Sequence, residues 1–113
     1  MRRNIALHYD NAQTIYLYTH WDAVGLETTL ASSLERARER WNDPTYLARI
    51  IFTDMTDKVG QDLTGYGLSP FEIDPEYSTL NVDLEQQSVN GIAYEQFIVD
   101  ASLFPAAHDA DRL

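Results

Sequence analysis

The spacing of apolar residues changes twice along this chain of 113 residues, and these changes constrain the fold more than any other feature. Residues 4–9 and 14–20 alternate between apolar and polar positions, which is typical of β-strands. Asp10-Asn11 lies between them and predicts a turn, so residues 4–20 are expected to form a hairpin. If Leu7 pairs with Leu17, His8 and His20 lie about four residue rises apart along the strands, which is too far for them to share a metal ion.

Two helices are predicted after this hairpin, because apolar residues then recur at helical spacing. The first stripe covers residues 26–41, and Glu35 can pair with Arg38 on its polar side. Asp43 is a good N-cap and Pro44 fits the first position of a second helix. That helix is expected to end near Val59.

Alternation resumes after a stretch without regular spacing. Residues 61–77 hold two glycines and two prolines and are predicted to form a long loop. Residues 79–85 alternate again and predict a strand. Asn90-Gly91 predicts a turn after it, and the next residues, GIAY, are expected to form the second strand of this hairpin. Residues 95–104 fit either a strand or a helix, and the spacing of Phe97, Ile98 and Ala101 favours the helix.

The resulting ββααββ order predicts an α+β fold, a two-layer sandwich over residues 1–104. The two hairpins are expected to form one antiparallel sheet, and two amphipathic helices to cover its apolar face. Residues 105–113 are predicted to be a flexible polar tail. The predicted core consists of Ile5, Leu7, Ile15, Leu17, Leu30, Leu34, Leu47, Ile51, Leu80, Val82 and Leu84.

The charge of the chain is strongly asymmetric. The formal net charge is −10. Residues 1–53 hold six acidic and six basic residues, whereas residues 54–113 hold twelve acidic residues and only Lys58 and Arg112. Direct nucleic-acid binding is not expected, because it requires a clustered basic face. An acidic surface favours solubility and steers association with basic partners.

Other classes of protein are excluded or disfavoured by composition. The chain has no cysteine, which excludes disulfides, thiolate metal sites and cysteine nucleophiles. No stretch approaches the roughly 20 apolar residues of a membrane helix. We therefore expect an intracellular protein without a cofactor, a bound metal ion or a membrane contact.

The stretch YLYTHWD, residues 16–22, holds the first candidate site. Strand alternation places Tyr16, Tyr18 and His20 on the sheet face opposite the helices, either as cross-strand stabilisers or as a contact patch. His20 with Asp22 fits a general base and its orienting carboxylate. Alternatively, Asp22 caps the coming helix and His20 bonds to a loop, which is the preferred interpretation because no nucleophile accompanies the pair.

The 61–77 loop supplies further candidates. Its TGYG stretch, residues 64–67, lacks the lysine of a phosphate-binding loop, so Tyr66 is expected to anchor the loop on the core. Carboxylates follow at positions that do not match a calcium loop. The candidate binding surface consists of Tyr16, Tyr18, His20, Tyr66, Glu72, Asp74, Glu76, Asp83 and Glu85.

Several blocks of the sequence together resemble a family of small proteins of actinobacterial bacteriophages. These blocks are YLYTHWD, RWNDPTYLARIIF and TGYGLS, within a similarity that runs from about Asn4 to Val99. The family has no established activity, so the resemblance carries over no catalytic residue. It implies a viral accessory protein expressed in the cytoplasm of a bacterial host. Ala23 stands where the family more usually has glycine.

Two functions from different classes follow as expectations. The first is an accessory protein that binds a host or viral protein, including a basic one, and acts as an inhibitor in anti-defence or host takeover. Its acidic residues would gather on one face if it mimicked nucleic acid. The alternative is a small hydrolase or nucleotide-handling enzyme that uses His20, Asp22 and the 61–77 loop. A homodimer formed through an open sheet edge is a third expectation.

Overall fold

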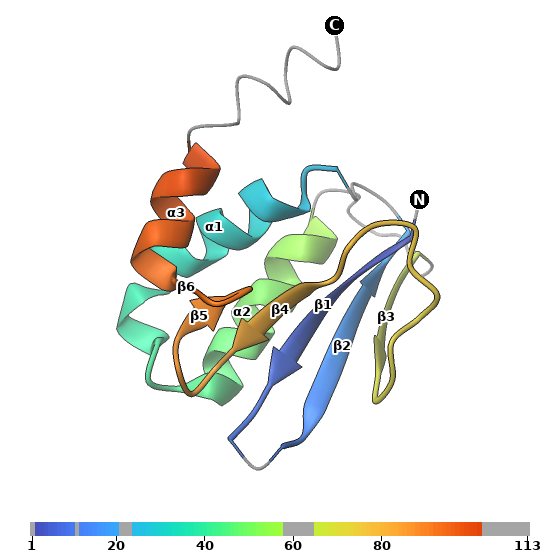
Figure 1. Ribbon diagram of the computed structural model, residues 1–113, viewed down its shortest axis with the longest axis horizontal. Coiled ribbons are helices and arrows are strands. Elements are labelled where there is room, and N and C mark those ends of the chain that lie inside the picture. Colours follow the sequence, from blue (N-terminus) through green and yellow to red (C-terminus); the bar gives the residue numbers. More distant parts are fainter. Residues whose placement is uncertain (1, 11, 21–23, 58–64, 103–113) are drawn as a thin grey trace, which may run out of the picture.

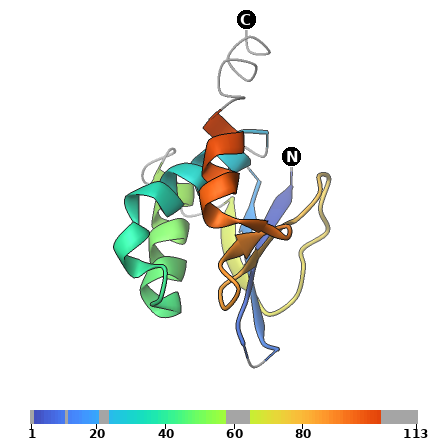
Figure 2. The ribbon, with the colours of Figure 1, turned by 60° about the vertical axis from the view of Figure 1, so that its left-hand side comes forward.

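A computed structural model describes residues 2–10, 12–20, 24–57 and 65–102. It is an α+β structure with one six-stranded mixed sheet, in the order β3-β2-β1-β4-β5-β6. The strands are β1 (Arg3–His8), β2 (Thr14–Thr19), β3 (Tyr66–Ser69), β4 (Leu80–Asp83), β5 (Ser88–Val89) and β6 (Ile92–Ala93). The helices are α1 (Leu26–Arg36), the short 3-10 helix η1 (Arg38–Arg40), α2 (Pro44–Asp57) and α3 (Tyr94–Ser102). Figures 1 and 2 show the helices on one face of the sheet and the segment before β4 on the other.

The predicted first hairpin is confirmed, but its register differs from the expected one. Ile5, rather than Leu7, lies opposite Leu17. The connection is longer than a two-residue turn, because Tyr9 donates its backbone N–H to the carbonyl of Gln13 at 2.9 Å. The shift moves the partners by two residues, so every side chain keeps its predicted face.

The prediction of a purely antiparallel sheet is wrong, because β1 pairs with β4 in parallel. A parallel pair needs a long crossover connection, and residues 9–79 supply one that contains α1 and α2. The late turn is confirmed: Asn90 and Gly91 both have positive φ angles, 51° and 81°, and they join β5 to β6. The predicted pairing of residues 79–85 with the strand after this turn is wrong, because β4 pairs with β5, which precedes the turn, and the strand after the turn, β6, also pairs with β5.

The 61–77 segment is not a continuous loop, because it contains β3. This strand pairs antiparallel with β2 and places Tyr66 opposite Thr19. Its sequence, YGLS, has one glycine and is followed by proline, so it lacks the alternation that marks the other strands. Residues 61–64 lie outside the described residues.

The two predicted helices are present, together with a third helix. The first predicted helix is divided, because α1 ends at Arg36 and η1 follows from Arg38. The second begins at Pro44 as expected, and the description reaches Asp57, so its predicted end near Val59 lies outside the described ranges. The segment that fitted a strand or a helix is α3. Each helix described is too short or too polar to span a membrane.

Ten of the eleven predicted core residues are buried between the sheet and the helices, and Ile15 is not. Ile15 is 39% exposed although it lies on the helix side of β2. Its end of the hairpin projects past the helices in Figure 1, so no helix covers it. The core also takes in Leu26, Tyr94 and Phe97, which join α1 and α3 to it.

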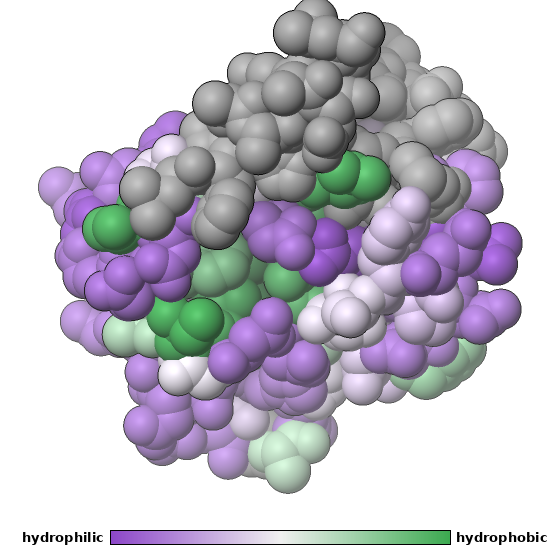
Figure 3. Space-filling model, turned by 45° about the horizontal axis from the view of Figure 1, so that its top comes forward, coloured by the Kyte–Doolittle hydropathy of each residue, from purple (hydrophilic) through white to green (hydrophobic). Residues whose placement is uncertain are grey.

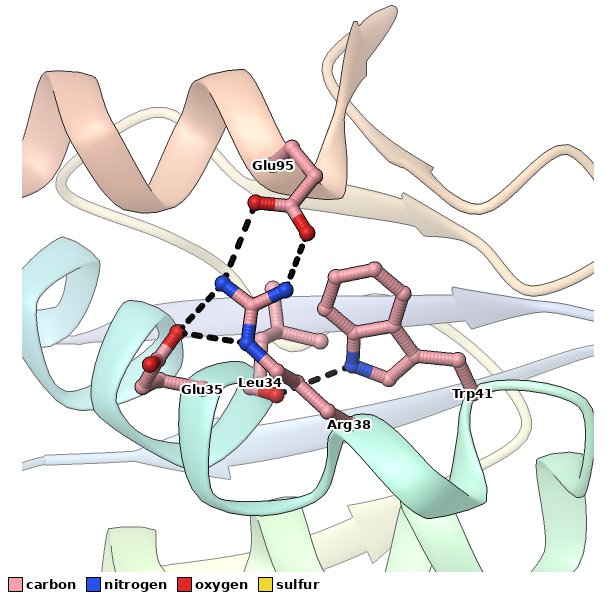
Figure 4. A network of polar contacts seen from close by, with 5 residues as sticks. All are labelled: Leu34, Glu35, Arg38, Trp41 and Glu95. Carbon is pink, nitrogen blue, oxygen red and sulfur yellow. Dashed lines mark hydrogen bonds and ion pairs between the residues drawn. The ribbon is translucent and has the colours of Figure 1, made fainter.

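A polar network fastens α3 to the end of α1 (Figure 4). The guanidinium group of Arg38 binds Glu95 of α3 and Glu35 of α1, the latter at 2.6 Å from Nη2. It also lies 5.1 Å from the ring centroid of Trp41. The indole N–H of Trp41 donates to the carbonyl of Leu34 at 2.9 Å, so η1 and the residue after it are held against α1 and α3.

A second polar contact joins α1 to α2. Asp54 binds the exposed guanidinium of Arg36, and its Oδ2 lies 2.6 Å from the fully buried hydroxyl of Ser33. Burial alone would raise the pKa of Asp54, but the hydrogen bonds from Arg36 and Ser33 outweigh it and hold the pKa below its ordinary value. A carboxyl whose pKa is lowered by folding stabilises the fold in its ionised form.

We predict that Asp54→Asn lowers the free energy of unfolding by about 1 kcal/mol at neutral pH. The Asp54 contribution is present above the ordinary pKa of 3.8 and is lost as the pH falls through the lower pKa of the folded state. The difference between the two proteins should therefore shrink in urea titrations below that pH. Asp57→Asn, at an exposed position of the same helix, is the control and should change stability less. A difference independent of pH would contradict the role of the ionised carboxylate.

Candidate functional site

The sheet face opposite the helices, called here the open face, carries the predicted tyrosines. Tyr18 lies opposite Asn4 and Tyr16 opposite Ala6, and both tyrosines are half-buried. Asn4 and Ala6 themselves are fully buried. The open face is therefore partly covered, which the alternation of residues alone could not predict.

Its cover is residues 70–79, called here the crossing segment, which runs over the open face between β3 and β4 (Figure 2). The side-chain amide of Asn4 holds this segment like a strand partner. Asn4 Nδ2 donates to the carbonyl of Ile73 at 2.7 Å, and the Ile73 N–H donates to Asn4 Oδ1 at 3.2 Å. A buried amide that is satisfied in this way fixes the segment at one place on the sheet.

Arg2 makes a second clamp on the crossing segment. The backbone N–H of Glu76 donates to the carbonyl of Arg2, and the backbone N–H of Arg2 donates to Glu76 Oε1, both at 2.8 Å. Arg2 Nε donates to the carbonyl of Asp74 at 2.9 Å. The hydrogen bond from the Arg2 backbone is the main reason that the pKa of Glu76 is lowered from its ordinary value. The Glu76 carboxylate and the Asp74 backbone carbonyl thus help to hold the segment.

His20 joins this end of the open face. Its Nδ1 lies 3.3 Å from the hydroxyl oxygen of Tyr18, and its backbone N–H donates to the carbonyl of Gly65 at 2.7 Å. Tyr18 and His20 therefore lie together, as the sequence predicted.

The other predicted site residues do not belong to this surface. Tyr66 lies on the helix side of β3 and packs against the core with its hydroxyl buried, which matches the expected anchoring role. Asp83 pairs in register with His8, at the far end of β1 from Asn4. Its Oδ1 accepts from the backbone N–H groups of Glu85 and Gln86, so Asp83 caps a turn.

The enzyme hypothesis gains no support from this geometry. Asp22 and Thr64 lie outside the described residues, so neither the His20–Asp22 pair nor the complete TGYG loop can be assessed. His20 has Tyr18 as its side-chain neighbour on the open face, which supplies no activated nucleophile. Among the described residues, no group of three or more histidine and acidic side chains could hold a metal ion.

The outer edge of β3 is a surface that the sequence interpretation did not locate, although it expected the sheet to have an open edge. Within the described ranges, β3 is the last strand on its side of the sheet, with β2 as its one neighbour. Leu68 is 62% exposed and Phe71, just beyond the strand, is 65% exposed. The sequence does place two apolar residues, Leu68 and Phe71, near Pro70. Because residues 61–77 were predicted to form a loop, this segment was not considered as an edge strand.

The second missed feature is a cleft between α1, α3, β6 and the end of the crossing segment, called here the α1–α3 cleft. Its volume is about 580 Å³. It is lined by Arg3, Val24, Glu27, Thr28, Tyr77, Ser78, Ile92, Phe97, Asp100 and Ala101. Figure 3 views the molecule from this side and shows apolar surface gathered near the middle of the face, with polar residues around it.

Acidic residues of the second half lie on both layers of the molecule. Asp54 and Asp57 are on α2, and Glu95 and Asp100 are on α3, in the helix layer. Glu72, Asp74 and Glu76 are on the crossing segment, over the opposite face of the sheet. Mimicry of nucleic acid requires these charges on one face, so we do not propose it.

Comparison of the chain with protein-family models, with curated proteins and with solved structures gives no match. The resemblance to actinobacteriophage proteins therefore stays a prediction. The functional argument depends on the geometry of the chain itself.

We predict that Asn4→Ala releases the crossing segment. Loss of the amide leaves the N–H and carbonyl groups of Ile73 without their partners, which should cost about 1–3 kcal/mol in unfolding free energy. Hydrogen exchange of the Ile73 amide should accelerate before global unfolding. Asn81→Ala, which removes an exposed amide from the same face, should leave that exchange rate unchanged. An unaltered Ile73 rate in Asn4→Ala would contradict the clamp.

Proposed function

We propose that the protein is a small accessory protein that binds a host or viral protein inside a bacterial cell, along the free edge of β3. The observation that carries the proposal is the exposure of Leu68 and Phe71, at 62% and 65%, at the outermost strand of the described sheet. An exposed strand with apolar side chains invites pairing with an extended segment of another chain. Backbone hydrogen bonds would supply affinity, and Leu68 would supply a side-chain contact.

The surroundings of β3 favour a basic partner. Glu72 and Asp74 follow Phe71 on the crossing segment, and the Asp74 side chain remains 89% exposed although its Oδ2 lies 3.8 Å from Arg2 Nη2. Five arginines are already paired with carboxylates of the chain: Arg2, Arg3, Arg36, Arg38 and Arg40. The excess of acidic residues therefore remains to attract a segment that contains lysine or arginine. Inhibition of the bound protein is the effect that we propose for such an association.

The rigid open face supports this mode of binding. Asn4 and Arg2 hold the crossing segment, which in turn places Phe71 next to the end of β3. A partner that binds a fixed edge loses less conformational entropy than one that must first order a loop. Tyr16 and Tyr18 lie on β2, next to β3, and add half-buried aromatic side chains on the face of the sheet opposite Leu68.

We predict that Leu68→Lys abolishes capture of the partner from host lysate by the tagged protein. The charged side chain replaces the exposed apolar contact and blocks strand addition, so the captured partner should fall by about tenfold or more. Circular dichroism and urea titration should show an intact fold, because Leu68 is mostly exposed. Val99→Lys, at a half-exposed site on α3, is the matched control and should retain the partner.

The same experiment separates the competing outcomes. High salt should weaken capture if the partner is basic, because exposed charges are screened. A partner retained equally by both variants would contradict binding at β3. If sizing shows a dimer that Leu68→Lys converts to a monomer, the edge serves self-association instead, and the proposal of a foreign partner fails.

A further inference from the structure

The α1–α3 cleft has the size and the lining of a small-molecule site. Its volume of about 580 Å³ lies within the range of pockets that hold organic ligands. Phe97 and Ala101 are 7% and 8% exposed and form apolar wall on α3. Val24 and Ile92 line the same cleft and are 41% and 39% exposed, so a ligand would remove their apolar surface from water.

The buried cation of the cleft is already neutralised. Arg3 is 6% exposed, and its two terminal nitrogens each lie 2.7 Å from an oxygen of Glu27. Its Nε donates to the carbonyl of Ser78 at 2.7 Å. A paired buried guanidinium stabilises the join between β1, α1 and the crossing segment, and its charge is matched within the protein. The cleft therefore does not present Arg3 as a site for an anionic ligand.

Asp100 gives the cleft its excess charge. This half-buried residue lines the cleft from α3, and its Oδ1 accepts a hydrogen bond from Gln96 Nε2 at 2.7 Å. Gln96 is neutral, so it does not compensate the carboxylate. Among the described residues, no arginine or lysine forms an ion pair with Asp100. Arg3 and Glu27 cancel, which leaves one net negative charge at this otherwise largely apolar site.

We propose that the α1–α3 cleft binds a small organic molecule with an apolar body and one protonated amino group. The body lies against Ile92, Phe97 and Ala101, and the ammonium group faces Asp100. The net charge of −10 favours the approach of such a cation and opposes that of an anion. The cleft shares no residue with the β3 edge, so this proposal does not depend on the proposed function.

Three probes with the same apolar body test the proposal. They are 2-(1-naphthyl)ethylamine, 2-(1-naphthyl)ethanol and 1-naphthylacetate, titrated into the full chain and followed through amide chemical shifts. The amine should shift the amides of Ile92 and Ala101 and bind about tenfold more tightly than the carboxylate, with the alcohol between them. Absence of shifts at the cleft for all three probes would overturn the proposal, as would equal affinity of the amine and the carboxylate.

Variants assign the two parts of the site. Asp100→Asn should reduce amine affinity about fivefold and leave that of the alcohol unchanged, because it removes the charge and preserves the shape. Ile92→Ser, at an exposed position, should weaken both the amine and the alcohol without loss of the fold. Val99→Ser is the control on α3, outside the cleft lining, and should alter neither affinity. Unchanged amine binding in both Asp100→Asn and Ile92→Ser would place the probe elsewhere and refute the assignment.

Discussion

The structure depends on the burial of five consecutive residues of one strand. Residues 3–7 of β1 are all buried, and β1 is paired on both sides, with β2 and with β4. Its alternate side chains then organise the two faces. Ile5 and Leu7 join the core with the helices, and Arg3 binds Glu27 of α1. On the other face, Asn4 holds the crossing segment. A polar residue on each face thus has the partner that its burial requires.

Regular spacing made much of this arrangement predictable from the sequence. Local patterns are sufficient for the hairpin, the helical stripes and the Asn90-Gly91 turn, because each depends on neighbouring residues. The parallel pairing of β1 with β4 depends on contacts between segments some seventy residues apart in the chain, as in Ile5 with Leu80. Strand β3 was not predicted, because Gly67 and Pro70 interrupt the alternation of apolar and polar residues in this segment. Ile15 was misjudged because spacing shows a side chain's face and does not show where the covering helices end.

The candidate surfaces were likewise only partly predictable from the sequence. Strand alternation correctly placed Tyr16 and Tyr18 on the face away from the helices. The α1–α3 cleft could not be foreseen, because its lining comes from α1, α3, β6 and three further segments, those that hold Arg3, Val24 and Tyr77. One signal was available: Arg3 shares the parity of Ile5, so an arginine was due to be buried on the core side and needed a carboxylate nearby. The structure thereby carries two separate features, an exposed strand edge and an apolar cleft with one excess acid.

Residue-resolved native-state hydrogen exchange tests the central place of β1 most directly. If β1 is the buried middle strand, the amides of Ile5 and Leu7 should exchange only through global unfolding, at the free energy that urea titration measures. The amides of β3, on the sheet edge, should exchange by local opening at lower free energy. Exchange of Ile5 and Leu7 as fast as that of β3 would contradict the account, because β1 would then not be the strand that both layers require.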